Sequence, residues 1–135
     1  MKLSVCILAG GEGKRMKSAL PKVLHLFKLK QMIVHVIEKS FKLSPERIII
    51  VTGRYNNLIQ KTIKQFIEEK YYDKLIFVIQ ETPMGTGHAI SCTLSNYNED
   101  EMVLILNGDT PNISSNLLQK FTNRYENRLL ISVIE

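Results

Sequence analysis

The sequence has no tryptophan, only two cysteines and no apolar run that approaches the ~20 residues of a membrane-spanning helix. Cys6 and Cys92 lack the CxxC spacing of redox and zinc motifs. We therefore expect reduced thiols in a cytoplasmic protein, with Cys6 buried in a strand. The apolar start, residues 3–8, is too short for a signal peptide and is typical of a first strand. With 44% hydrophobic and 23% charged residues, the composition excludes disorder and coiled-coil character.

Acidic residues are the scarcer charge, since 13 Asp and Glu face 18 Lys and Arg and the formal net charge is +5. Proteins that bind nucleic acid usually cluster basic residues with aromatic residues between them, whereas the basic residues here are scattered. The densest basic stretch, residues 14–17 with Lys22 close behind, lies beside glycines. This arrangement favours a small anionic ligand, and we expect no nucleic-acid partner and no membrane association.

The order of apolar segments predicts the fold class. The 135 residues correspond to a single domain, residues 1–135, because domains usually have roughly 100–200 residues. Continuous apolar runs, typical of strands covered on both faces, alternate with segments whose apolar residues recur at helical spacing. We expect an α/β fold with a mostly parallel sheet and helices on both faces. The expected strands are residues 3–8, 47–53, 75–79, 102–106 and 129–134, and the expected helices include residues 33–41, 59–67, 86–94 and, after an N-cap at Ser114, 117–121.

Ligands of such sheets bind beyond the carboxyl ends of the strands, and the glycine-rich segments of this sequence lie there. The first strand is followed by Gly10, Gly11 and Gly13 and by the cations Lys14, Arg15 and Lys22. Glycines expose N–H groups to an anion, and the cations supply the positive charge that a triphosphate needs. The spacing matches neither a P-loop nor a dinucleotide fingerprint, and a tight turn is the alternative interpretation.

Polar residues also follow the later strands. Asp109 comes after the fourth strand and could hold Mg²⁺ on phosphates, although an Asx-type turn before Pro111 is the alternative. Gln80 closes the third strand, where its amide can donate and accept hydrogen bonds as base recognition requires, although an isolated Gln more often only ends a strand. His88 has no second histidine at metal-ligand spacing and is interpreted as structural.

Four segments in register carry a family resemblance. They are residues 8–16 (LAGGEGKRM), 20–25 (LPKVLH), 84–89 (MGTGHA) and 107–114 (NGDTPNIS). Together they resemble the sugar-phosphate nucleotidyltransferases, and in particular the N-terminal uridylyltransferase domain of the bifunctional N-acetylglucosamine-1-phosphate uridyltransferases. The first loop is shared by many nucleotidyltransferases, whereas the Gly-Thr-Gly-His-Ala segment at this distance is much more specific. The resemblance covers essentially the whole chain.

The resemblance implies a Rossmann-like three-layer sandwich of the nucleotide-diphospho-sugar transferase type. It also implies the Mg²⁺-dependent reaction of UTP with N-acetylglucosamine 1-phosphate, which gives UDP-N-acetylglucosamine and pyrophosphate without a protein nucleophile. By position, Arg15 and Lys22 would be the catalytic residues that hold phosphates, and Asp109 would hold Mg²⁺. The nucleotide would contact Leu8, Ala9, Gly10, Gly11, Gly13 and Lys22, with Gln80, Gly85 and Thr86 at the uracil and Gly108 near the ribose.

The sequence also departs from the family pattern. Asn107 replaces the usual Tyr, and the glycine expected before the first helix is missing around residues 29–31. The family domain continues beyond this point with the residues around the sugar and an Asn metal ligand, so the chain is expected to be truncated relative to the family. A catalytically incomplete nucleotide-binding or interaction domain is therefore the alternative to an enzyme, and a cytidylyl- or guanylyltransferase is a third. The last apolar strand would leave a sheet edge through which a homo-oligomer could form.

Overall fold

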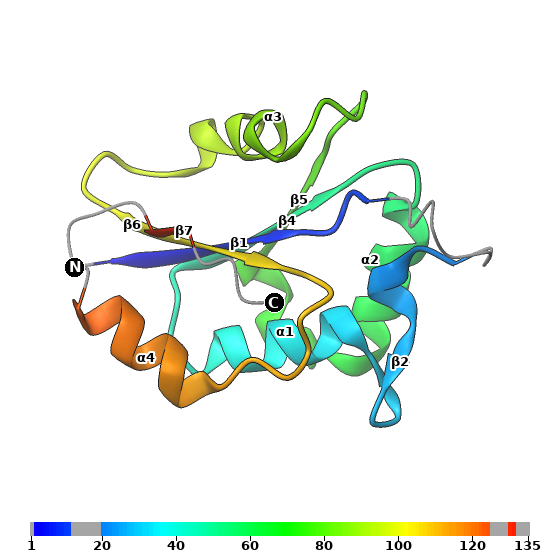
Figure 1. Cartoon of the computed structure of the whole chain (residues 1–135), viewed down its shortest axis with the longest axis horizontal. Helices are drawn as coiled ribbons and strands as arrows, with labels where there is room; N and C mark the ends of the chain where they lie inside the picture. Colours follow the sequence, from blue (N-terminus) through cyan, green and yellow to red (C-terminus); the bar gives the residue numbers. More distant parts are fainter. Residues whose placement is uncertain (1, 12–19, 125–129, 132–135) are drawn as a thin grey trace.

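The computed structural model describes residues 2–11, 20–124 and 130–131 (Figure 1). In these residues one sheet of five strands has the order β5-β4-β1-β6-β7, and every neighbouring pair is parallel. The strands are β1 (Leu3–Leu8), β4 (Arg47–Thr52), β5 (Leu75–Ile79), β6 (Met102–Asn107) and β7 (Leu130–Ile131). The predicted parallel sheet is confirmed, and the other residues expected in the last strand, 129 and 132–134, lie outside the described residues.

Helices cover both faces of this sheet. The short α3 (Thr86–Ser91) lies over one face, and α1 (Met32–Phe41), α2 (Asn56–Phe66) and α4 (Ser115–Arg124) lie over the other (Figure 1). Short 3₁₀ helices connect some of these elements: η1 (Lys22–Leu24), η2 (Glu69–Lys74) and η3 (Leu94–Asn96). The three layers are those of the expected α/β sandwich. Among the described residues, no helix combines the length and the apolar composition that crossing a bilayer requires.

Alternate residues of the central strand β1 enter two different cores. Val5 and Ile7 pack with the apolar residues of α1 and α2, whereas Cys6 packs with Ala89 of α3, and all three strand residues are fully buried. Because both faces are covered, every position of the strand needs a side chain that tolerates burial, which explains the continuous apolar run. Burial also raises the pKa of the Cys6 thiol, so the thiol stays protonated, as expected of a structural cysteine.

The helices differ in detail from the prediction. The helix expected over residues 86–94 ends at Ser91, and the separate turn η3 follows it. In α4, Leu118 is buried whereas its neighbour Leu117 is 48% exposed, because adjacent residues of a helix point in different directions. The predicted N-cap is confirmed, since Ser114 Oγ accepts a hydrogen bond from the Leu117 N–H at 3.3 Å.

A short hairpin between η1 and α1 has no signal in the sequence. It pairs β2 (Leu26–Phe27) with β3 (Lys30–Gln31) in antiparallel fashion. Its two-residue turn holds Lys28 at a φ of 49° and Leu29 at a φ of 72°, a conformation in which glycine or asparagine is preferred. The turn coincides with the place where the glycine of the family pattern is missing, and Leu29 is 90% exposed.

Replacing Leu29 by glycine should therefore stabilise the protein. The left-handed conformation costs a residue with a Cβ roughly 1–2 kcal/mol, and the larger entropy of glycine in the unfolded chain offsets part of the gain. We expect Leu29→Gly to raise the free energy of unfolding by up to about 1 kcal/mol in urea titrations. The matched control is Leu94→Gly, at an exposed leucine of η3 without positive φ, and this substitution should lower the free energy of unfolding. If Leu29→Gly lowers the free energy of unfolding as much as the control does, the left-handed conformation assigned to Leu29 is contradicted.

A buried ionic network ties together the amino-terminal ends of the sheet strands. The Glu101 side chain is 1% exposed, and its carboxylate accepts hydrogen bonds from Arg47 Nη1 and from the Asn98 N–H, both at 2.9 Å, and from Ser4 Oγ. Arg47 Nη1 also donates to the Asn96 carbonyl at 2.5 Å. Because these groups come from β1, β4 and the segment before β6, the network joins the three central strands at the end opposite to the candidate site.

Removing the charge of Glu101 should destabilise the fold, because Arg47 would keep its burial and lose its counter-ion. We expect Glu101→Gln to lower the free energy of unfolding by about 2–3 kcal/mol, less than for a fully buried pair because Arg47 is 22% exposed. Chemical denaturation measures the change. Glu99→Gln, at an exposed position two residues away, is the control and should change stability by less than about 0.5 kcal/mol. Equal midpoints for the two variants would rule out the network as a stabilising element.

Candidate functional site

Hydrogen bonds that continue the sheet past the strand ends position the site. The backbone N–H groups of Ala9 and Gln80 donate to carbonyl oxygens at the end of β4, both at 2.8 Å. The Gly108 N–H donates to the Leu8 carbonyl at 2.9 Å. The segments that follow β1, β5 and β6 are therefore held side by side at the carboxyl edge of the sheet, where ligands of such folds bind.

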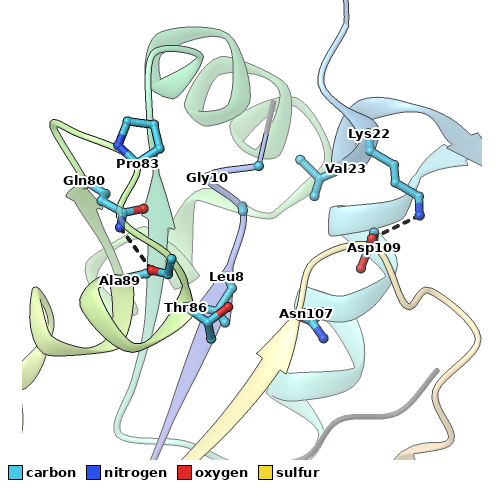
Figure 2. Close-up of a pocket in the computed structure, with 13 residues that line it drawn as sticks. Leu8, Gly10, Lys22, Val23, Gln80, Pro83, Thr86, Ala89, Asn107 and Asp109 are labelled. Atoms are coloured by element: carbon cyan, nitrogen blue, oxygen red, sulfur yellow. Dashed lines mark hydrogen bonds and ion pairs between the residues drawn. The ribbon is translucent and has the colours of Figure 1, made fainter. Parts of the chain in front are cut away.

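A pocket of ≈ 410 Å³ opens at this edge (Figure 2). The turn after β5 and the start of α3 form one wall, and Lys22, Val23 and the loop after β6 form the opposite wall. Its volume lies within the range of small-molecule sites. The lining residues are Leu8, Ala9, Gly10, Gly11, Lys22, Val23, Gln80, Pro83, Gly85, Thr86, Ala89, Asn107 and Asp109.

Most of the predicted site residues meet in this pocket. The lining includes the predicted Leu8, Ala9, Gly10, Gly11, Lys22, Gln80, Gly85, Thr86 and Asp109. Gly13 and Arg15 lie outside the described residues, and what was expected of them stays a prediction. Segments far apart in the sequence thus converge on a single pocket.

Gly108 was expected near the ribose and the sugar, and that expectation stays a prediction. It does not line the pocket but sits between two residues that do, Asn107 and Asp109. A Cβ at this position would lie 3.1 Å from Val23 Cγ1 and 3.2 Å from the Leu8 carbonyl oxygen. A side chain here would be crowded, so glycine favours the close approach of the β6 end to β1 that brings Asn107 and Asp109 to the pocket.

The uncharged end of the pocket is organised around Gln80. This side chain is 8% exposed, and its Nε2 donates to the Gly85 carbonyl at 3.3 Å and contacts His88 Nδ1 at 2.9 Å. Its Oε1 faces the first loop, where a methyl group on Gly10 would lie 3.5 Å away (Figure 2). Such a contact is ordinary, so the packing around position 10 leaves room for a methyl group. The site thus presents a hydrogen-bond acceptor to the pocket.

The charged end of the pocket holds an ion pair. Lys22 Nζ lies 3.2 Å from Asp109 Oδ2, and the two side chains are 50% and 33% exposed (Figure 2). A pair this exposed contributes little to stability. Both charged groups therefore remain accessible to a ligand that carries charges of both signs, such as a phosphate chain with a divalent cation.

The loop that carries Asp109 is tied to the body of the protein. Lys39 Nζ of α1 donates to the Pro111 carbonyl at 2.6 Å, and Thr110 Oγ1 donates to the Asn107 carbonyl at 2.9 Å. Burial, together with the nearby Lys28 and Lys42, lowers the pKa of Lys39. The bond of Lys39 restrains the loop from one side, so Asp109 is held on a supported loop.

The carboxylate at the charged end of the pocket suits a metal ion that is bound jointly by the protein and by the phosphates of a ligand. Among the described residues, no group of three or more His, Cys, Asp or Glu side chains could hold a metal ion. Asp109 is the one carboxylate among the described residues that line the pocket. Mg²⁺ is commonly bound by one or two carboxylates together with substrate phosphates and water, so this residue is suited to Mg²⁺ held jointly with a ligand.

Some residues of the site had no signal of their own in the sequence. Val23, Pro83 and Ala89 line the pocket although apolar residues in these segments carry no recognisable chemistry. His88 was interpreted as structural, and it contacts the one buried polar side chain of the pocket wall, Gln80. The available signal was position in the quoted segments, since Val23, His88 and Ala89 lie within residues 20–25 and 84–89 and Pro83 directly precedes the latter.

Comparisons with known proteins agree with this geometry. A family model described as "MobA-like NTP transferase domain" matches residues 5–133. A protein of Acanthamoeba polyphaga mimivirus named "Probable UDP-N-acetylglucosamine pyrophosphorylase" is 42% identical over 139 residues, which cover 98% of this chain and 52% of that protein. "Bifunctional protein GlmU" of Pseudomonas aeruginosa is 44% identical over 120 residues, or 89% of this chain and 25% of that protein. The chain thus spans about half, or less, of the length of these curated relatives.

Solved structures share the fold. A nucleotidyl transferase from Methanothermobacter superposes with a TM-score of 0.76 at 16% identity, covering 90% of this chain and 57% of that one. Rv0371c from Mycobacterium tuberculosis H37Rv superposes with a TM-score of 0.74 at 14% identity, covering 90% and 59%. A structure of the latter protein in complex with manganese has a TM-score of 0.71 at 13% identity, covering 91% and 59%. At these identities the likeness concerns the architecture alone.

Lys22 should matter for a phosphate ligand and little for stability. We expect Lys22→Met to weaken the binding of inorganic tripolyphosphate with Mg²⁺ by roughly 10- to 100-fold, because a charge-assisted contact worth about 1.5–3 kcal/mol is lost. The free energy of unfolding should change by less than about 1 kcal/mol. Titration calorimetry and denaturant titrations measure the two quantities.

The control for this variant is Lys30→Met. Lys30 Nζ pairs with Glu38 Oε1 at 2.5 Å, the two side chains are 35% and 40% exposed, and neither lines the pocket. Its loss should leave the affinity for tripolyphosphate unchanged. If both variants weaken binding to the same extent, the anion is attracted by net charge and not by the pocket.

Proposed function

The chain belongs to the MobA-like NTP transferase family, and on that premise we propose that it binds UTP with Mg²⁺ and transfers the uridylyl group to N-acetylglucosamine 1-phosphate. The products would be UDP-N-acetylglucosamine and pyrophosphate. The name of the mimiviral relative supports this choice of substrates. The residues of the pocket independently support a nucleoside triphosphate as one of them.

The observation that carries the proposal is the polarity of the pocket. Gln80 Oε1, Gly85 and Thr86 lie at the uncharged end, and Lys22 and Asp109 lie at the charged end. A nucleoside triphosphate has the same division, with a neutral base at one end and a phosphate chain at the other. The proposed pose therefore places uracil against Gln80 and the triphosphate against the ion pair.

The reaction needs positioning and charge compensation, and no protein nucleophile. An oxygen of the sugar 1-phosphate forms a bond to the α-phosphorus of UTP, and the bond from that phosphorus to the bridging oxygen breaks, so pyrophosphate leaves with the electron pair. The ammonium group of Lys22 would offset the charge that accumulates on the phosphate oxygens. Asp109 would hold Mg²⁺, which when bound withdraws charge from the phosphates and orients them. The described loop restraints around Asp109 keep its carboxylate at the pocket.

A second candidate is a nucleotide-binding domain without turnover. The shared region is 52% of the mimiviral relative and 25% of the Pseudomonas relative, and neither name says which part of those proteins carries turnover. Both candidates require UTP binding, and only the enzyme requires release of pyrophosphate. Binding and turnover must therefore be measured separately.

The test of the enzyme is pyrophosphate release by the purified chain supplied with UTP, Mg²⁺ and N-acetylglucosamine 1-phosphate. We expect release that depends on all three, and a loss of roughly 100-fold or more in Asp109→Asn, because charge stabilisation at the phosphates is lost. Asp73→Asn, an exposed position in η2, is the matched control and should keep full activity.

The outcomes separate the candidates. Saturable, Mg²⁺-dependent binding of UTP without pyrophosphate release supports the second candidate, a nucleotide-binding domain without turnover. Release that survives Asp109→Asn unchanged contradicts the role of this carboxylate. Absence of UTP binding at millimolar concentration contradicts both candidates.

A further inference from the structure

We infer that His88 is a positioning residue that fixes the amide orientation of Gln80 and thereby makes the pocket select a base that donates a hydrogen bond. The inference deepens the proposed function and rests on it, because it takes Gln80 as the group that meets the base. His88 itself is not among the described residues that line the pocket, so it would act only through its neighbour.

The geometry around the amide places two acceptors on the same side. Gln80 Nε2 lies 2.9 Å from His88 Nδ1 and 3.3 Å from the Gly85 carbonyl oxygen. The contact with the carbonyl is at the long end for an N–H···O hydrogen bond, so the shorter contact with the ring nitrogen is the stronger restraint. Cys92 Sγ lies 4.0 Å from the same ring nitrogen, which is too far to compete strongly with the amide.

The Gly85 carbonyl, which can only accept a hydrogen bond, indicates which atom of the amide faces the pocket. If the amide were flipped, Gln80 Oε1 would meet that carbonyl oxygen, and it could pair with His88 Nδ1 only if this nitrogen carried a proton. With Nε2 held by both, Oε1 is left facing Gly10 and the pocket. The arrangement requires that His88 Nδ1 carries no proton, so the neutral ring holds its proton on Nε2.

A fixed acceptor distinguishes the two common pyrimidines. Uracil carries a hydrogen on N3 and can donate it to Gln80 Oε1. Cytosine has an unprotonated acceptor at N3, so it would place two acceptors together unless the amide turned over. His88 opposes that turn because it occupies the donor side of the amide. Buried polar groups that are left unpaired by the wrong ligand are an effective source of selectivity.

The experiment measures the dissociation constants of UTP and CTP, each with Mg²⁺, by titration calorimetry. The wild-type chain is expected to prefer UTP. His88→Leu, which removes the acceptor, should lower the CTP-to-UTP ratio of dissociation constants by roughly three- to tenfold, the equivalent of one hydrogen bond. His88→Asn should restore most of the ratio, since its Oδ1 stands as many bonds from the backbone as the Nδ1 of histidine and accepts in its place.

The outcomes keep the inference apart from the proposed function. A wild-type chain that binds both nucleotides equally contradicts the uridine assignment itself. A wild-type preference that persists in His88→Leu overturns only the role of His88. A parallel loss of affinity for both nucleotides, with the ratio unchanged, means that His88 is merely structural and likewise overturns the inference.

A second measurement does not depend on the folding of any variant. Nitrogen-15 NMR of the wild-type chain distinguishes the two neutral forms of the His88 ring. The inference expects the proton on Nε2 and a hydrogen-bonded Nδ1 without a proton. A proton on Nδ1 would leave this nitrogen unable to accept from Gln80, and would overturn the inference.

Discussion

A parallel hydrogen-bond ladder that runs beyond the strands themselves is the constraint on which the site depends. Ala9, Gln80 and Gly108 are the first residues after β1, β5 and β6, respectively. Each donates its backbone N–H to a carbonyl of the neighbouring strand. Side chains carried by three separate segments are therefore positioned by backbone geometry and not by loop preference. The buried strands β1, β4 and β6 supply the rigidity, because their residues fill two cores on opposite faces of the sheet.

The two ends of the pocket use different kinds of interaction. At one end, partly buried hydrogen bonds hold the amide of Gln80 with its Oε1 toward the cavity. At the other end, Lys22 and Asp109 compensate each other's charge while both remain accessible, and Lys39 supports the loop from behind. Buried polar contacts with defined direction suit selectivity, whereas exposed charges suit attraction of a phosphate chain and a cation. The proposed uridylyl transfer uses both ends together.

Much of this arrangement could be predicted from the sequence, for physical reasons. Strands buried on both faces require uninterrupted apolar runs, and the runs at residues 3–8, 47–52 and 102–107 are of this kind. The run at residues 75–79 is also apolar, although it forms an edge strand that is only partly buried. The hairpin at residues 26–31 could not be predicted, because Lys28 and Leu29 adopt positive φ without the usual glycine or asparagine. The partnership of His88 with Gln80 has no sequence signal either, since it depends on the path of the intervening turn. Gly108 illustrates a third case, because its close approach to Val23 and Leu8 depends on how β6 lies against β1 and has no signal in the sequence.

The most direct test of the central claim is a crystal structure of the chain with UTP and Mn²⁺, in which anomalous scattering locates the metal. The account predicts the uracil against Gln80 Oε1, the triphosphate beside Lys22, and the metal on Asp109. A nucleotide bound in the reverse direction, or bound with its metal outside the pocket, would contradict the assignment of the two ends on which the proposed function rests.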